Sequence, residues 1–146
     1  MAKLKANNIT THVIAGFPGV GKSWLSDKLG DKVSDSDSSK FPKDGFPQNY
    51  INHIKSLIGV KKIILVSTHK PVLQALESEG IQYVLVHPGR DLKDEYLERY
   101  KKRGSPQAFI DLLNKNWDSF MNDIESANPK RRIVLKAGEY LKDGLK

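Results

Sequence analysis

Five short runs along the chain have the composition of strands, and four of the five are mainly apolar. β-branched residues are frequent in them, which is typical of residues that pack inside a sheet. The clearest run is Lys62-Ile63-Ile64-Leu65-Val66-Ser67, which ends on a polar residue. The predicted strands span residues 11–15, 32–37, 62–67, 81–86 and 132–136.

Between these runs, apolar residues recur at helical spacing. In the longest such stretch, which begins at Ser105-Pro106, they form one stripe that we expect to face the core. Trp117 lies on this stripe, so we expect it in the core rather than on the surface as a platform for a base. Ser67 or Thr68 is expected to cap the helix that follows them. The predicted helices span 24–29, 48–58, 71–79, 92–103 and 106–124, and a short helix follows residue 138.

Strands that alternate with helices predict an α/β fold with a parallel sheet and helices on both of its faces. The chain contains no internal repeat, low-complexity segment or linker. We therefore expect a single domain over residues 1–146, which is long enough to bury a core of its own.

The turn after the first predicted strand carries the most specific motif of the chain. Residues 16–23 read Gly-Phe-Pro-Gly-Val-Gly-Lys-Ser, the pattern G-x-x-x-x-G-K-[ST] between a strand and a helix. Glycines in such a loop let backbone N–H groups converge on phosphate oxygens, and the helix N-terminus adds its positive end. Lys22 is expected to reach the β- and γ-phosphates, and the Ser23 hydroxyl to ligate Mg²⁺. The motif predicts binding of a nucleoside triphosphate.

Two carboxylates follow the second predicted strand. Asp35 and Asp37 are two residues apart, so on an extended backbone both side chains face the same side. Phosphoryl transfer uses one carboxylate to accept the proton of the attacking hydroxyl and acidic support for Mg²⁺. The alternative is a solvated turn, because serine and aspartate are ordinary loop residues. Other polar groups stand at predicted strand ends, where ligands collect in open α/β sheets: Ser67-Thr68-His69, His87-Pro88-Gly89-Arg90 and Lys136-Ala137-Gly138.

A basic segment around residues 90–106 is a candidate lid. Glu95, Arg99 and Arg103 are spaced i, i+4, i+8 and therefore share one face of a helix, and Gly104 follows as a hinge. Guanidinium groups can grip phosphate bidentately and neutralise charge as the γ-phosphoryl group moves. The alternative is a ladder of surface salt bridges.

Net charge and cysteine content narrow the class of protein. The formal charge is +7, which favours anionic partners such as nucleotides or nucleic acid, although basic residues also serve solubility. The absence of cysteine excludes disulfides and thiolate metal sites. No apolar run approaches the roughly 20 residues of a membrane span, and the first residues lack the apolar stretch of a signal peptide. We expect a cytoplasmic protein without a membrane partner.

With the loop at 16–23, Asp35-Ser36-Asp37 and Leu97–Gly104 in this order, the chain resembles a small P-loop kinase. The group includes adenylate, shikimate and gluconate kinases and the kinase domain of phage polynucleotide kinase, and the compact form is similar to phage-encoded members. The resemblance implies a P-loop NTPase domain with strand order 2-3-1-4-5.

The resemblance also implies roles for single residues. Asp35 would lie near the metal and Asp37 at the acceptor, while Arg99 and Arg103 would contact the phosphates of ATP. The segment after the last strand would pass the adenine. The nucleotide-binding residues implied in this way are Gly16, Phe17, Pro18, Gly19, Val20, Gly21, Lys22, Ser23, Trp24, Arg99, Lys136, Ala137 and Gly138; the metal ligands are Ser23 and Asp35.

One departure from the group keeps several functions open. The third predicted strand ends Val66-Ser67-Thr68 without the usual metal-supporting aspartate. The leading hypothesis is an ATP- and Mg²⁺-dependent phosphotransferase that acts on a small acceptor, a nucleoside or nucleotide first. The alternatives are a 5′-hydroxyl polynucleotide kinase, a nucleotide-binding module that has lost catalysis and acts through a partner, and a plain NTPase.

Overall fold

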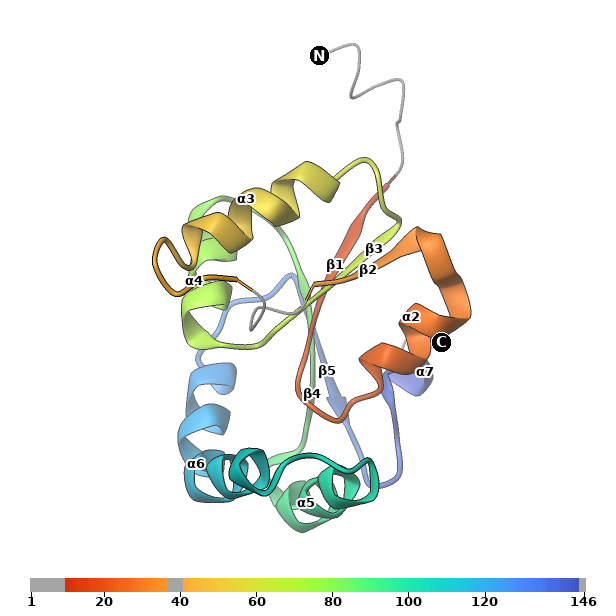
Figure 1. Ribbon diagram of the computed structural model, residues 1–146, viewed down its shortest axis with the longest axis vertical. Helices are drawn as coiled ribbons and strands as arrows, with labels where there is room; N and C mark the ends of the chain where they lie inside the picture. Colours follow the sequence, from red (N-terminus) through yellow and green to blue (C-terminus); the bar gives the residue numbers. More distant parts are fainter. Residues whose placement is uncertain (1–9, 37–40, 145–146) are drawn as a thin grey trace.

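Five parallel strands form one sheet in the order β2-β3-β1-β4-β5 (Figure 1). The structure is a computed structural model, and it describes residues 10–36 and 41–144. The predicted parallel sheet is confirmed, and its strand order is the one that the family resemblance implies. The strands are β1 (His12–Gly16), β2 (Val33–Asp35), β3 (Ile63–Val66), β4 (Val84–Pro88) and β5 (Arg131–Leu135).

Helices cover both faces of this sheet, as predicted. Helices α3 and α4 lie on one face, and α2 and α7 lie on the other (Figure 1). Within the described ranges, every helix is too short or too polar to cross a lipid bilayer. The helical elements are α2 (Lys22–Leu29), η1 (Gly30–Lys32), α3 (Gln48–Leu57), α4 (Lys70–Ser78), η3 (Arg90–Leu92), α5 (Lys93–Lys102), α6 (Gln107–Glu125) and α7 (Leu141–Gly144).

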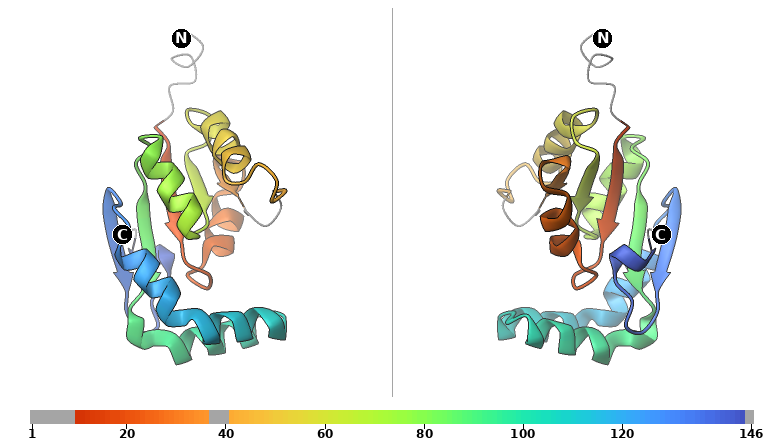
Figure 2. Two further views of the ribbon diagram at one scale, coloured as in Figure 1. Left: turned by 90° about the vertical axis from the view of Figure 1, so that its left-hand side faces the viewer. Right: turned by 90° about the vertical axis from the view of Figure 1, so that its right-hand side faces the viewer.

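Helices α5 and α6 form a hairpin beyond the carboxyl ends of the strands (Figure 2). Most of the stripe predicted on α6 faces the core, and Trp117 is buried in it as expected. Leu112 was predicted on the same core-facing stripe, but it is 50% exposed. The face of α5 that points inward carries Tyr96 and Tyr100, both fully buried. The hairpin therefore stands over the same edge of the sheet as the loop between β1 and α2.

Two predicted boundaries are wrong. Helix α4 begins at Lys70 with His69 at its N-cap and has no side-chain cap, so neither Ser67 nor Thr68 caps it. Strand β4 begins at Val84 rather than Ile81, because the Ile81 N–H instead bonds to the Leu76 carbonyl and closes α4. Local propensity could not separate the end of this helix from the start of the strand.

His87, at the end of β4, packs inside the protein. Its Nδ1 donates to the Pro88 carbonyl at 2.8 Å, and its Nε2 accepts from the Arg132 guanidinium at 3.0 Å. Arg132 also donates to the carbonyls of Ile124 and Ala127, so the group ties β4 and β5 to the end of α6. His87 is thus satisfied by protein partners.

His87 should make the stability of the protein fall in mild acid. Burial lowers the pKa of this imidazole, and the neighbouring Arg132 lowers it further, against the raising effect of the Pro88 carbonyl. Below about pH 6.5 the unfolded chain binds a proton here that the native state does not bind, so the free energy of unfolding decreases as pH falls. The slope from this group reaches about 1.4 kcal/mol per pH unit. Urea unfolding between pH 7 and 5 should give a flatter profile for His87→Asn than for the wild type.

Candidate functional site

Five consecutive carbonyl groups in the loop between β1 and α2, from Phe17 to Gly21, each accept a hydrogen bond. The donors come from α2, α5, the start of α7 and the loop itself. Such a loop is held in one shape, because each carbonyl has a defined partner. The pairs are Val20 N–H to Phe17 O (3.2 Å), Tyr100 O–H to Pro18 O (2.8 Å), Arg99 to Gly19 O (2.8 Å), Leu141 N–H to Val20 O (2.7 Å) and Leu25 N–H to Gly21 O (3.3 Å).

The loop and the first residues of α2 also carry backbone N–H groups that could bind a ligand. Within residues 10–36 and 41–144, the N–H groups of Gly19, Gly21 and Ser23 donate to no acceptor. They stand at the N-terminus of α2, where the first N–H groups of a helix have no partner in the helix and the helix dipole is positive. Adjacent N–H groups of this kind bind anions, and phosphate is the typical ligand.

Glycine is required at two positions of this loop. The Lys22 side chain runs back across Gly16, where a Cβ would lie 2.9 Å from the Lys22 Cδ. Gly19 has φ +92°, and a Cβ there would lie 2.9 Å from the Tyr100 ring. The first glycine thus lets the lysine lie across the loop, and the second lets the loop lie on helix α5.

An aromatic cluster packs around Phe17 of the loop and continues onto helices α5 and α6. The Phe17 ring packs edge-on against Trp117 at a centroid distance of 5.4 Å and against Tyr96 at 6.3 Å. Tyr100 continues the cluster toward Phe109, with ring centroids 5.2 Å apart. Burial also raises the pKa of Tyr100, so its hydroxyl stays protonated and can donate to the Pro18 carbonyl.

Arg99 holds the loop in place. Its side chain is only 9% exposed, and it donates to the carbonyls of Gly19 and Glu139, each at 2.8 Å. The guanidinium also forms an ion pair with Glu95 and lies between the rings of Tyr96 and Tyr140, 4.2 and 3.9 Å from their centroids. The Glu95–Arg99 pair has the i, i+4 geometry of the alternative weighed from the sequence. Arg99 therefore holds the loop between β1 and α2 by a hydrogen bond to a backbone carbonyl of that loop.

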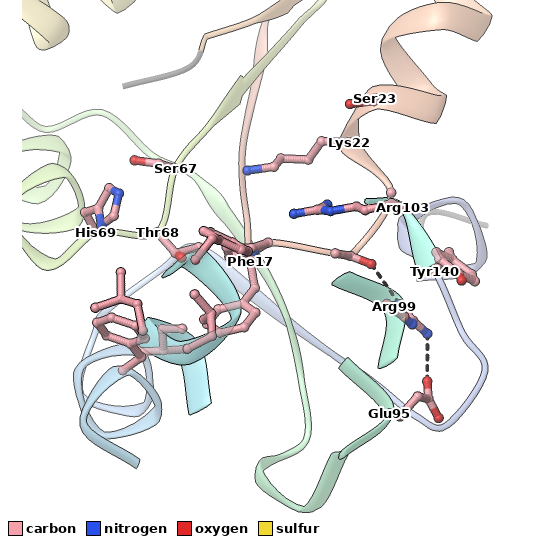
Figure 3. Close-up of a pocket in the computed structure, with 18 of the residues that line it drawn as sticks. Phe17, Lys22, Ser23, Ser67, Thr68, His69, Glu95, Arg99, Arg103 and Tyr140 are labelled. Atoms are coloured by element: carbon pink, nitrogen blue, oxygen red, sulfur yellow. Dashed lines mark hydrogen bonds and ion pairs between the residues drawn. The ribbon is translucent and has the colours of Figure 1, made fainter. Parts of the chain in front are cut away.

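Arg103 is the more exposed of the two predicted arginines. It is exposed, its Nε donates to the Ser105 hydroxyl at 2.9 Å, and its guanidinium lies over the Tyr100 ring. Figure 3 shows the Arg103 and Lys22 side chains extending in the same direction, and both residues line the cleft that borders the loop. The two arginines of one helix face thus have different surroundings.

A cleft of about 1440 Å³ opens between the loop, the strand ends and the α5–α6 hairpin. Lys22, Ser23, Asp35, Arg99 and Arg103 all line it, so five residues predicted from separate segments are brought together. Asp37, the predicted base, lies outside the described residues. Other lining groups are Ser36, Ser67, Thr68 and His69, at the ends of β2 and β3.

Tyr50 is a residue of this site that the sequence did not single out. Its hydroxyl donates to the Ser36 carbonyl at 2.5 Å and lies 3.4 Å from the Ser67 N–H, which joins the ends of β2 and β3 from inside the protein. The Ser67 hydroxyl is buried beside it and has no hydrogen-bond partner within the described part of the chain. In the sequence, Tyr50 precedes the apolar residues of its helix, and only its hydroxyl distinguishes it from a purely apolar aromatic core residue.

The donor set suits Mg²⁺ that arrives with a nucleotide. Ser23 and Asp35 both line the cleft and offer the hard oxygen atoms that Mg²⁺ prefers. Among residues 10–36 and 41–144, no cluster of three or more His, Cys, Asp or Glu side chains could bind a metal by itself. The residues present therefore fit an ion that shares its ligands with phosphate and water.

Several predicted nucleotide contacts lie away from the cleft. Trp24 is 46% exposed on α2, with Lys142 over its ring, and it does not line the cleft. Lys136 and Ala137 are exposed outside the lining, whereas Gly138 lines it and donates its N–H to Glu95 at 3.0 Å. Two loop residues, Phe17 and Val20, use their N–H groups within the protein.

Comparison with known proteins finds similarity at the level of structure. No protein-family model matches this chain, and no curated protein matches it in sequence. A crystal structure of an uncharacterized protein from Eubacterium ventriosum is similar at a TM-score of 0.47 and 12% identity, over 92% of this chain and 93% of that one. Function must therefore be inferred from the site itself.

Proposed function

We propose that the protein is a P-loop phosphotransferase that binds ATP with Mg²⁺ and transfers the γ-phosphoryl group to a small acceptor, a nucleoside or nucleotide first. The observation that carries the proposal is the loop at 17–21, whose carbonyls all accept hydrogen bonds, while the N–H groups of Gly19, Gly21 and Ser23 donate to no acceptor among the described residues. A loop whose carbonyls are all bonded in this way is held in place before phosphate binds. This preorganisation favours a triphosphate over a chance glycine-rich turn.

The residues around the loop have chemistry that suits phosphoryl transfer. Lys22 would neutralise the β- and γ-phosphates, and Arg103 would bind the γ-phosphoryl group as its charge moves. The acceptor oxygen forms a bond to the γ-phosphorus while the bond to the β–γ bridging oxygen breaks. The hydroxyl proton passes to a carboxylate, Asp37 or its neighbour Asp35.

Ser23 and Asp35 would hold the metal, directly or through water. When bound, Mg²⁺ would supply positive charge that offsets the negative charge of the phosphates during transfer. The absence of a carboxylate at the end of β3, where Ser67 stands, leaves this role to Asp35 and to water molecules.

A second candidate, the 5′-hydroxyl polynucleotide kinase, gains support from the charge at the cleft. Lys102 and Arg103 are exposed on its rim, and the chain carries a net charge of +7. An oligonucleotide acceptor would bind through its phosphates, so its transfer rate at low concentration should fall steeply as salt rises. A nucleoside acceptor carries no phosphate and should show a weak dependence on salt.

Transfer from labelled ATP to pooled nucleosides, nucleotides and oligonucleotides tests the proposal. We expect label in one acceptor class with the wild type, and a loss of about 100-fold or more when the proton acceptor is changed. Asp37→Asn and Asp35→Asn are the matched pair that assigns this role. ATP binding without transfer to any acceptor would contradict the phosphotransferase and support the binding module instead. Release of free phosphate alone would support a plain NTPase.

A further inference from the structure

The cleft extends to two sides of the phosphate loop. Figure 3 shows Ser67, Thr68 and His69 on one side of Lys22, and Glu95 and Tyr140 on the other. On the first side, the lining continues between the start of α4 and helix α6 over residues that are almost all apolar. We call this part the apolar arm; its residues are Pro71, Leu112, Leu113, Phe120 and Ile124.

The apolar arm is open to a ligand. Leu112 is 50% exposed and Phe120 is partly buried, although both stand on a helix whose other apolar side chains form the core. A half-exposed leucine and a partly buried phenylalanine that line a cleft are typical of a surface that binds apolar groups. Their burial by a ligand would contribute to binding.

The charged residues at the apolar arm favour an uncharged ligand over an anion. At its rim, Lys70 at the start of α4 forms an ion pair with Asp123 of α6, with the two charged atoms 3.9 Å apart. The ammonium group of Lys70 is therefore already paired with a carboxylate, and Asp123 itself would repel an anion. A carboxylate or phosphate placed between leucine and phenylalanine would lose its hydration without an ion pair of its own. The cations Lys22 and Arg103 lie near the loop at 16–23 instead.

We infer that the apolar arm binds the acceptor by an uncharged planar ring, with the acceptor hydroxyl toward Lys22. This inference rests on the proposed function, and it specifies the acceptor as an unphosphorylated alcohol that carries a heteroaromatic ring, such as a nucleoside. Polyol acids have no apolar face for Leu112 and Phe120 and are excluded. The ring of the donor nucleotide then binds on the other side of the loop, near Gly138 and Tyr140.

Leu112→Gln is the variant that tests the apolar arm, because this half-exposed side chain can change without disturbing the core. Val60→Gln is its control, since Val60 is 49% exposed and does not line the cleft. Binding of adenosine, thymidine and D-gluconate is measured by saturation-transfer NMR on protein loaded with a non-hydrolysable ATP analogue. We expect at least one nucleoside to bind the loaded protein and gluconate not to bind. Leu112→Gln should weaken nucleoside binding about tenfold, while Val60→Gln and the affinity for the analogue stay unchanged.

Three results would overturn the inference: no nucleoside binds the loaded protein, gluconate binds more tightly than the nucleosides, or Leu112→Gln weakens the analogue instead. The last result would assign the apolar arm to the donor ring. Failure of the proposed function is a separate outcome, in which the wild type does not bind the ATP analogue at all. Nucleoside binding that still depends on Leu112 would support the apolar arm even then.

Discussion

Replacement of Lys22 with methionine is expected to lower phosphoryl transfer from ATP by about 100- to 1000-fold, the usual cost of removing one charged group that stabilises the transition state. Methionine retains much of the aliphatic chain, which packs across Gly16, so the loop should keep its shape. The variant therefore isolates the ammonium group. Transfer rates, ATP affinity and the urea midpoint measure its effects on catalysis, binding and stability.

Lys28→Met is the matched control, because Lys28 is exposed on the same helix and does not line the cleft. It should leave all three quantities at the wild-type level. If Lys22→Met transferred phosphate as fast as this control, the loop at 16–23 would not be the site of the reaction. An unchanged rate with a lowered urea midpoint would give Lys22 a structural role only.

Replacement of Arg99 with alanine is expected to destabilise the protein by about 2–4 kcal/mol and to weaken ATP binding. The change leaves the carbonyls of Gly19 and Glu139 without their donor and the Glu95 carboxylate without its cation. It also leaves a gap between the rings of Tyr96 and Tyr140. The free energy of unfolding from urea titration measures the first effect, and nucleotide titration measures the second.

Arg103→Ala gives the contrast one helical turn away. This guanidinium is exposed, so we expect a change of less than about 0.5 kcal/mol in stability but a clear decrease in the transfer rate. Tyr100→Phe tests the loop from the same helix, because it removes only the hydroxyl bond to Pro18 O, and about 1 kcal/mol of stability should be lost. Equal losses of stability in the two arginine variants would contradict the separate roles given to them.

The parallel sheet and the helices around it could be predicted from the sequence, because period and composition report burial directly. Trp117 is an example, since its place on a long apolar stripe of α6 already favoured the core over a surface role. The boundary of β4 could not be predicted, because Ile81 is apolar whether it closes α4 or begins the strand. Trp24 was placed in the site by its position after the loop, but on α2 that position faces solvent.

The sequence by itself predicted where phosphate would bind. Glycine spacing, Lys22 and Ser23 are local features, and the first N–H groups of the helix that follows such a loop have no partner within the helix. The spacing of Arg99 and Arg103 likewise placed both on one face of a helix.

Only the tertiary structure decided what each of these arginines does. Arg99 bonds to Gly19, 80 residues away in the chain, and Arg103 reaches the cleft beside Lys22. Tertiary packing likewise leaves Leu112 exposed where it lines the cleft, while its neighbour Leu113 is buried. Periodicity in the sequence determines which residues share a face of a helix or strand. What that face contacts is determined by packing between segments that are distant in the chain, and these contacts decide what each side chain can do.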